Sequence, residues 1–436
     1  MKMIMITAPS SGEGKTLITL GIIRALKNRN IDISGFKTGG DFLDTKYLSY
    51  ASGKRAGNLD THLIGVRGLK DALSINKGDM GIIEGAMGYF DGMGDGYKNS
   101  SYDISKLLDI NAILVYTPRG EMFSTIPKIK GMVDFSRNRI KGIILNKVNR
   151  EMYLRLQKKI KEYIDVEVLG FMEKDEDLEI EGKSLGLAQD LNRTEIDNII
   201  EKAAFKVEKN IDIDRVMELC RKVKLPSYYY PTRRNIKIAI AYDKAFAFYY
   251  NESLSLFENT CDVEYFSPMD DESLPQCDLL YISGGETYFY RDELAKNHAM
   301  TKSIKEMAES GGFIYGESGG LMYLAEYIDE SSMCGIFKGK SVMTDRLQRF
   351  GYVNMELKED CILGKKGDLL KGNEFHKSTS YIDDKEVLHI SKSEGKRTWK
   401  CGYKYKNVLI AYPHINFLGN KKAFCHLLDY VEGGMI

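Results

Sequence analysis

Residues 8–16 read Ala8-Pro9-Ser10-Ser11-Gly12-Glu13-Gly14-Lys15-Thr16, and they lie between a short apolar run and an amphipathic stretch. Such a turn between a strand and a helix is typical of phosphate-binding loops, because N–H groups near Gly12 and Gly14 can close on an anion. Lys15 would offset charge on the β- and γ-phosphates, and Thr16 would hold a magnesium ion. Pro9 replaces the first glycine of the common pattern. The Gly-Lys-Thr ending still favours a nucleotide-binding site over an ordinary glycine turn.

Outward from this loop, short apolar runs alternate with longer amphipathic stretches, as βαβ units require. The runs are almost continuously apolar, which predicts buried parallel strands. In the first half we expect strands at Ile4–Thr7, Ile31–Lys37, Met80–Glu84, Ala112–Tyr116, Ile140–Leu145 and Val166–Phe171. The rhythm restarts at Ile236–Ala241, Val263–Phe266, Leu279–Ile282 and Phe313–Tyr315. The predicted fold class is therefore α/β, with two doubly wound domains.

Length and composition limit the alternatives. A chain of 436 residues is too long for one ordinary core, so we expect domains at 1–225 and 235–436, separated by a proline-containing stretch after the polar segment 202–224. The 62 basic and 62 acidic residues cancel, which gives no electrostatic reason to expect nucleic acid or a membrane as a partner. No apolar run approaches the ~18 residues of a membrane span. The seven cysteines form no C-x-x-C pair, so we expect a cytoplasmic protein with reduced thiols.

Two further segments place carboxylates after predicted strands, where ligands gather in open α/β sheets. The first is Phe36-Lys37-Thr38-Gly39-Gly40-Asp41-Phe42-Leu43-Asp44. Taken alone, Asp41 and Asp44 would more often be a helix cap and a solvated charge. The second is Ile82-Ile83-Glu84-Gly85-Ala86-Met87-Gly88-Tyr89-Phe90-Asp91-Gly92. Glu84 ends a buried strand there, which suits a carboxylate that binds magnesium.

The first half of the chain resembles the cobyrinic acid a,c-diamide synthase family, a P-loop amidoligase of the dethiobiotin-synthetase-like group. The resemblance is carried by A-P-x-x-G-x-G-K-T, F-K-x-G-x-D-x-x-D, G-N-L-D at Gly57–Asp60 and E-G-x-M-G-x-F-D-G. It implies that Lys15 and Thr16 bind ATP and magnesium, and that Asp91 lies near the reacting substrate. It also implies that Glu84 and an aspartate of the Asp41/Asp44 pair act at the metal and the carboxylate, with Asp41 as our choice of metal ligand. Two more segments are similar to the adenine side of the nucleotide site and to the end of the domain, namely Ile144–Val148 with Asn146, and Ser184–Leu187.

The second half contains Gly316-Glu317-Ser318-Gly319-Gly320 after a predicted strand, which indicates a nucleophile elbow at Ser318. By itself this string fits a serine hydrolase with His414 as its base, or an inert glycine turn. In the family the same string carries the cysteine that attacks glutamine in class I amidotransferases, and His414 stands at the catalytic histidine position. The resemblance also implies an oxyanion turn at Gly284-Gly285 and retains G-N-E-F-H-K-S at Gly372–Ser378. Asn416 stands where a triad carboxylate or a second histidine is expected, so we expect poor or lost glutamine hydrolysis.

The leading hypothesis is ATP-dependent amidation of the a- and c-acetate carboxylates of cobyrinic acid in cobalamin biosynthesis. ATP would phosphorylate the carboxylate, and glutamine or ammonia would supply the nitrogen that displaces phosphate. A metallated sirohydrochlorin is the second choice of tetrapyrrole acid, and a degenerate paralogue that binds without turnover is a further alternative. A P-loop switch ATPase would have no use for the carboxylate cluster, and a serine hydrolase would leave the first domain idle. A homodimer is one assembly that the sequence allows.

Overall fold

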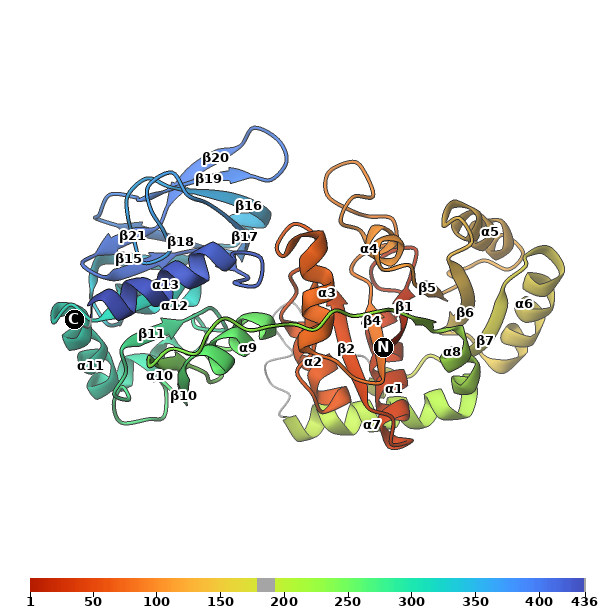
Figure 1. The fold of residues 1–436 in the computed structure, drawn as a ribbon. Helices are drawn as coiled ribbons and strands as arrows, with labels where there is room; N and C mark the ends of the chain where they lie inside the picture. Colours follow the sequence, from red (N-terminus) through yellow and green to blue (C-terminus); the bar gives the residue numbers. More distant parts are fainter. Residues whose placement is uncertain (179–192, 435–436) are drawn as a thin grey trace. The chain divides into compact units, whose positions relative to one another are not determined.

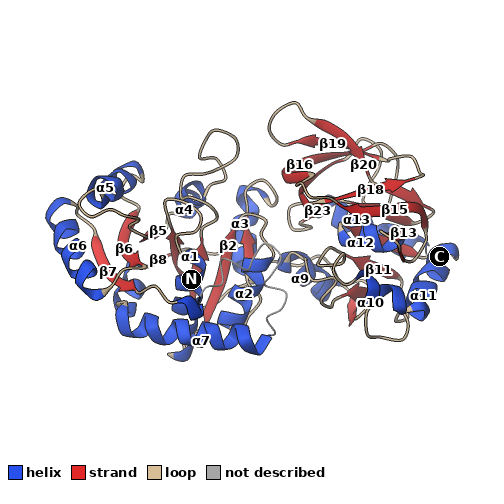
Figure 2. Ribbon diagram, turned by 180° about the vertical axis from the view of Figure 1, so that it is seen from behind, coloured by secondary structure: helices blue, strands red, loops and turns tan. Residues whose placement is uncertain are grey.

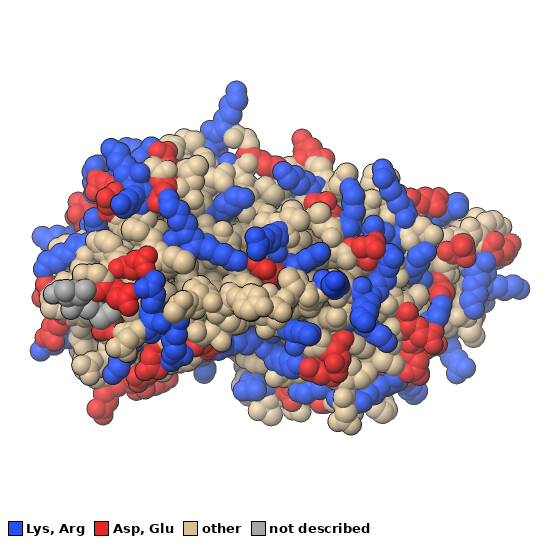
Figure 3. All heavy atoms as spheres, viewed as in Figure 1, with Lys and Arg blue, Asp and Glu red and all other residues tan. Residues whose placement is uncertain are grey.

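The computed structural model describes residues 1–178 and 193–434, which form two compact units. The first unit comprises Met1–Thr61 and Val66–Tyr228, and the second comprises His62–Gly65 and the chain from Tyr229 onward. The string at 184–187 lies outside the described residues. On the face that Figure 3 shows, basic and acidic side chains are interspersed. Among the described helices, none has the length and apolar character needed to cross a bilayer.

The first unit is built on one sheet whose main path has the order β3-β2-β4-β1-β5-β6-β7, with each neighbouring pair parallel (Figure 1). The strands are β1 Lys2–Thr7, β2 Ile33–Thr38, β3 Gly57–Leu59, β4 Met80–Glu84, β5 Asn111–Tyr116, β6 Ile140–Asn146 and β7 Glu167–Met172. The short β8, Arg221–Lys222, pairs with β1 in the antiparallel direction. All six predicted strands are present, each within two residues of its predicted ends, and β3 is additional.

Helices flank this sheet (Figure 2). They are α1 Lys15–Asn28, α2 Leu43–Ser52, α3 Gly65–Ile75, α4 Ser101–Leu108, α5 Thr125–Phe135, α6 Arg150–Tyr163, α7 Arg193–Asn210 and α8 Ile213–Leu219, with a 3-10 turn at Glu176–Leu178. The polar stretch 202–224 proves to contain the end of α7 and all of α8, which bury apolar side chains such as Val207 and Val216. The many charged residues of this stretch lie on the opposite faces of the helices. Its composition alone therefore does not reveal that it contributes to the core.

The second unit also contains a doubly wound sheet, of order β10-β9-β11-β12-β22-β21, which is parallel except for its last pair. Its strands are β9 Lys237–Ala241, β10 Asp262–Phe266, β11 Leu279–Ile282, β12 Phe313–Glu317, β21 Tyr403–Tyr405 and β22 Val408–Ala411. Its helices are α9 Asn251–Thr260, α10 Arg291–Lys296, α11 His298–Glu309, α12 Gly319–Leu324 and α13 Lys421–Gly434. Both units are therefore α/β, as predicted.

Two smaller sheets of the second unit are absent from the prediction, with orders β14-β13-β15-β18 and β20-β19-β16-β17-β23. Their strands are β13 Ala325–Ile328, β14 Ser331–Ser332, β15 Phe337–Met343, β16 Arg349–Leu357, β17 Leu369–His376, β18 Ser378–Ile382, β19 Leu388–Lys392, β20 Thr398–Cys401 and β23 His414–Ile415. Along β16 and β17, buried residues alternate with more exposed ones. Such strands lack the continuous apolar runs that reveal buried parallel strands.

Arg24 joins α1 to α7 in the first unit. Its side chain is buried, and Nη2 lies 2.5 Å from Asp197 Oδ1 while Nη1 pairs with Glu201. The same guanidinium donates to the carbonyl oxygens of Ala51 and Tyr50, at 3.1 and 2.8 Å. One buried cation therefore fixes α2 and α7 on α1, the helix that begins at the phosphate-binding loop.

We expect Arg24→Met to lower the free energy of unfolding by about 2 to 3 kcal/mol, because two buried carbonyl oxygens and two carboxylates lose a charged donor. Arg29→Met is the matched control, since Arg29 also pairs with α7 through Glu208 but is about one-third exposed, and solvated pairs contribute about 0 to 1 kcal/mol. Urea unfolding of the full-length protein, followed by circular dichroism, measures both. Equal shifts for the two variants would contradict the role assigned to Arg24.

Candidate active sites in the two units

The predicted phosphate-binding loop has a shape that requires glycine. Gly14 adopts φ 85°, in the left-handed region, and a Cβ there would lie 2.1 Å from Asn146 Nδ2. Asn146, at the end of β6, donates to Glu13 O at 2.8 Å, and Thr117 N donates to Glu13 Oε2 at 2.9 Å. The ends of β5 and β6 thus hold the loop from one side. Asn146 supports the loop itself, and its predicted contact with the nucleotide stays a prediction.

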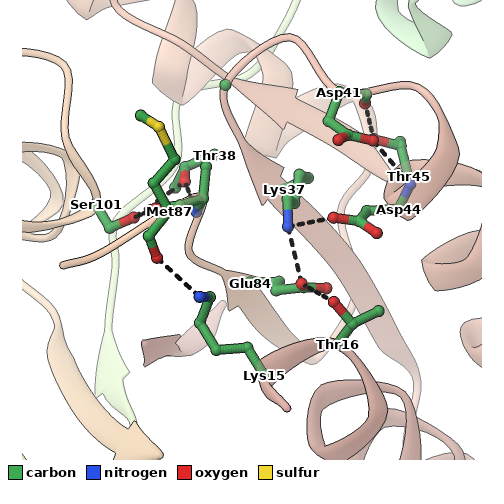
Figure 4. A network of polar contacts seen from close by, with 12 residues as sticks. Lys15, Thr16, Lys37, Thr38, Asp41, Asp44, Thr45, Glu84, Met87 and Ser101 are labelled. Atoms are coloured by element: carbon green, nitrogen blue, oxygen red, sulfur yellow. Dashed lines mark hydrogen bonds and ion pairs between the residues drawn. The ribbon is translucent and has the colours of Figure 1, made fainter. Parts of the chain in front are cut away.

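Lys15 and Thr16 point from the start of α1 toward the segment that follows β4 (Figure 4). Lys15 Nζ donates to Ser10 O at 3.0 Å and to Met87 O at 2.8 Å. Thr16 Oγ1 donates to Glu84 Oε1 at 2.6 Å. The predicted loop and the predicted carboxylate therefore lie together at the carboxyl edge of neighbouring strands β1 and β4.

A buried charge cluster occupies the next position along this edge. Lys37 Nζ, from β2, lies 2.8 Å from Glu84 Oε1 and 2.5 Å from Asp44 Oδ2. Burial raises the pKa of Glu84 to about 7, although the adjacent Lys37 ammonium lowers it. Burial alone would lower the pKa of Lys37, but the Asp44 and Glu84 carboxylates raise it above its ordinary value. Lys37 is therefore a fixed positive charge in a site with little water.

The residues present fit a magnesium ion at Glu84. Glu84 is fully buried, and its Oε2 has no hydrogen-bond partner among the described residues. With Thr16 Oγ1 in contact with Oε1, the site offers the oxygen ligands that Mg²⁺ prefers. No group of three or more His, Cys, Asp or Glu side chains in the described ranges could hold a metal ion. Phosphate oxygens and water would therefore have to complete the coordination shell, as is usual for this ion.

The two other predicted carboxylates have local structural partners. Asp41 Oδ1 accepts from the N–H of Asp44 at 2.9 Å, so Asp41 satisfies one backbone donor in the first turn of α2 (Figure 4). Asp91 Oδ2 accepts from the N–H of Gly88 at 2.9 Å and shapes the turn after β4. Asp44, by contrast, is no solvated charge, because it pairs with Lys37. The roles of Asp41 at the metal and of Asp91 at the substrate stay predictions.

In the second unit, Ser318 lies between β12 and α12 with φ 51° and ψ −105°. Positive φ is strained for serine and is typical of a nucleophile elbow. A Cβ built on Gly284 would lie 2.9 Å from His414 Nε2 and 3.0 Å from Ser318 Cβ. Ser318 and His414, predicted from distant parts of the sequence, therefore meet at Gly284, where any side chain would fill the space between them.

A carboxylate supports His414, and it comes from Glu317, the residue before the serine. Glu317 Oε2 lies 3.4 Å from His414 Nδ1. The Ser283 hydroxyl bridges the same two groups, at 2.9 Å from Oε2 and 3.2 Å from Nδ1. With acceptors facing Nδ1, the imidazole is oriented so that Nε2 faces Ser318.

Glu317 is buried and held by hydrogen bonds on both oxygens. The hydroxyls of Tyr281 and Tyr315 donate to it at 3.0 and 2.8 Å, and the N–H of Ile415 donates at 3.1 Å. Burial and the nearby Glu317 carboxylate raise the pKa of both tyrosines well above the ordinary value. Both hydroxyls therefore remain donors, and together with the N–H of Ile415 they fix the position of the Glu317 side chain.

The expectation of weak charge support for His414 considered only Asn416, which stands at the expected carboxylate position, and it overlooked Glu317. Asn416 Nδ2 donates to Glu252 Oε2 at 3.3 Å. Poor or lost glutamine hydrolysis stays a prediction. Glu317 belongs to the quoted string, and an acidic residue at the end of an apolar strand is the signal that sequence reasoning could have used. Lys37 was part of a quoted motif but received no role, and Ser283 gave no signal of its own.

Comparison with known proteins also divides the chain into a nucleotide-binding part and an amidotransferase part. Residues 4–187 match the CobQ/CobB/MinD/ParA nucleotide binding domain, and residues 237–422 match the CobB/CobQ-like glutamine amidotransferase domain. Cobyrinate a,c-diamide synthases from Clostridium tetani and Clostridium acetobutylicum are each 38% identical, with 98% of this chain and 100% of theirs covered. The enzyme of that name from Methanocaldococcus jannaschii is 35% identical, with 99% of this chain and 100% of the relative covered. Because the similarity extends over both sites and nearly the whole chain, the protein belongs to the cobyrinate a,c-diamide synthase family.

Proposed function

We propose that the protein amidates the a- and c-acetate carboxylates of cobyrinic acid in cobalamin biosynthesis, with ATP and Mg²⁺ and with glutamine or ammonia as nitrogen donor. The family supports this reaction. The observation that carries it is the set of contacts among Thr16, Glu84 and Lys37 beside the phosphate-binding loop. A switch ATPase does not account for a buried lysine and carboxylate cluster of this kind.

In the first step, an oxygen of the substrate carboxylate attacks the γ-phosphorus of ATP, and ADP leaves. Lys15 can exchange its two carbonyl contacts for phosphate oxygens, because the loop carbonyls are weaker partners than an anion. Lys37 supplies a second positive charge near the reacting groups. A magnesium ion held at Thr16 and Glu84 would neutralise charge on the phosphates. Ammonia then attacks the acyl-phosphate carbon, and phosphate leaves with the former carboxylate oxygen.

The second unit would release ammonia from glutamine. Ser318 Oγ attacks the amide carbon while His414 Nε2 accepts the hydroxyl proton and passes it to the leaving nitrogen. Glu317 keeps the imidazole oriented and stabilises its charged form, which a serine nucleophile needs more than a cysteine does. Water then hydrolyses the glutamyl ester. We therefore propose a working glutaminase with serine as nucleophile.

A serine hydrolase that acts on unrelated esters is the second candidate, because the same Ser318, His414 and Glu317 would serve it. It leaves the ligase cluster of the first unit without use. A metallated sirohydrochlorin stays an alternative substrate, and competition between it and cobyrinic acid in one amidation assay decides between the two.

Lys15→Ala should lower substrate-dependent ATP hydrolysis by about 10² to 10³-fold, since the transferred phosphoryl group loses its nearest positive charge. ADP release in the presence of cobyrinic acid and ammonium measures it. Lys27→Ala, near the other end of α1, is the control and should be neutral. If Lys15→Ala hydrolyses ATP at the wild-type rate, the phosphate-binding loop has no part in the mechanism.

Glu84→Gln preserves the shape of the side chain but removes the metal-binding charge, so we expect a higher Mg²⁺ requirement and loss of amide product, with folding retained. The amount of Mg²⁺ needed for half-maximal activity and the melting temperature are the two readouts. A variant that melts at a lower temperature but has normal specific activity would show that the carboxylate is structural.

Glu317→Gln tests the support of the base. We expect glutamine-dependent synthesis to fall by at least about 10²-fold, and ammonium-dependent synthesis to stay unchanged because the first unit is intact. Ser318→Ala should lose glutamine-dependent synthesis entirely. Ser318→Cys should raise it by about tenfold or more, because a thiol ionises more easily than a hydroxyl.

Unchanged glutamine use in both Ser318→Ala and Glu317→Gln would exclude this site as a glutaminase. Ammonium-dependent synthesis in the same preparations is the control, since it shows that each variant is folded and that its ligase site works.

A further inference from the structure

Strand β17 of the second unit carries three buried hydrogen-bond acceptors that the glutaminase mechanism does not use. They are both carboxylate oxygens of Glu374 and Nε2 of His376, and none has a hydrogen-bond partner among the described residues. Glu374 is only 1% exposed. The two residues are separated by one position on a strand, so their side chains lie on the same face of the sheet.

His376 presents Nε2 as an acceptor. Its Nδ1 lies 2.8 Å from the carbonyl oxygen of Ser378, and a carbonyl can only accept, so the proton of the neutral ring is on Nδ1. Burial lowers the pKa of His376 to about 4, which keeps the ring neutral near pH 7. The ring also stacks on Tyr412, with centroids 3.9 Å apart, so its orientation is fixed.

The neighbouring donors do not satisfy Glu374. The Trp399 indole and the Arg349 guanidinium both lower the pKa of Glu374, but burial outweighs them and raises it to about 7. By the distance and angle of an ordinary hydrogen bond, neither oxygen of Glu374 has a donor among the described residues. Arg349 stacks over the Trp399 ring, 4.8 Å from its centroid, and its Nη1 donates to the carbonyl of Gln348 at 2.8 Å. A buried carboxylate left in this condition is costly and needs an explanation, and a bound ion or ligand is one.

His376 contacts the segment that carries His414, the proposed base. β17 pairs with β23, so that Asn373 is opposite His414. Glu374 and His376 follow on the same strand, with their side chains on the other face of the sheet from Asn373. Tyr412, which stacks on His376, precedes His414 by two residues. The Tyr412 ring therefore connects His376 to the segment that carries His414, and a ligand held by Glu374 and His376 would lie against that segment.

We propose that Glu374 and His376 form a binding site for a primary ammonium group. An ammonium group carries only donors and a positive charge, which complements a carboxylate and an unprotonated ring nitrogen. The inference rests on the proposed use of glutamine or ammonia. The same chemistry has two sources, the free ammonium ion as nitrogen donor and the α-ammonium group of glutamine.

Glu374→Gln in the full-length protein tests the site. The KM for ammonium chloride and the KM for glutamine are measured separately, at constant potassium chloride to match ionic strength. An increase of about tenfold or more is expected for at least one donor, with the KM for ATP unchanged. If the KM for glutamine alone rises, the site takes the α-ammonium group; if the KM for ammonium rises, it takes the free ion. Unchanged values for both donors would overturn the proposal.

Calorimetric titration of glutamine and of ammonium chloride into the wild type and the variant gives a readout that does not need turnover. If the wild type makes no amide but binds either donor in a Glu374-dependent way, the proposed reaction fails and the site stands. If amide forms with ammonium and Glu374→Gln changes neither binding nor KM, the site fails and the reaction stands.

The control is Glu356→Gln on the adjacent strand β16, whose carboxylate is partly exposed and paired with Lys358 at 2.7 Å. It should leave both KM values unchanged. Because burial of the unpaired Glu374 carboxylate opposes folding, Glu374→Gln should melt at the same or a higher temperature than the wild type. A lower melting temperature with unchanged KM values would assign Glu374 a structural role. If Glu374→Gln fails to fold, His376→Leu is tested in its place by the same two calorimetric titrations, and the same outcomes decide.

Discussion

The ion pair between Lys37 and Glu84 is the constraint on which the first unit depends. Both groups are almost fully removed from water, and a buried charge without its partner is strongly destabilising. The pair can form only if β2 and β4 are neighbours and end in register, and the sheet aligns Lys37 with Glu84. The next strand, β1, leads into the loop whose Thr16 contacts the same carboxylate. Strand order, loop position and the contact of Thr16 with Glu84 are therefore consequences of one arrangement.

The second unit also depends on a buried carboxylate, Glu317. Glu317 is as deeply buried as Glu84, but donors surround it, so its position is fixed beside His414. Glu374 lies on the neighbouring sheet with its oxygens unsatisfied. Glu317 has its hydrogen-bond donors within the protein, whereas Glu374 would obtain its donors from the proposed ligand. The proposed serine nucleophile depends on the Glu317 carboxylate, since a hydroxyl needs a well-supported base.

The parallel strands and the ligase motifs could be predicted from the sequence because buried strands are continuous apolar runs and phosphate loops need particular glycines. Glu84 and Thr16 were placed together correctly by this reasoning, and Ser318 was matched with His414. The carboxylate beside His414 was missed, because the family pattern directed attention to position 416. Glu317, the last residue of β12, lies 3.4 Å from His414 Nδ1 instead. The smaller sheets were missed because their alternating strands resemble loops in a sequence of mixed polarity. Whether a buried acceptor such as Glu374 finds a hydrogen-bond donor depends on which side chains pack around it in the folded chain. No local sequence pattern gives this information.

The central claim is that a substrate carboxylate is activated by phosphorylation in the first unit. It is tested most directly with cobyrinic acid whose acetate carboxylates carry ¹⁸O, incubated with the protein, unlabelled ATP, Mg²⁺ and ammonium. The account predicts that each amide formed releases one phosphate bearing one ¹⁸O atom, because the carboxylate oxygen leaves with the phosphoryl group. Amide formation with unlabelled phosphate would contradict the account, since ATP would then have been hydrolysed by water rather than used to activate the carboxylate.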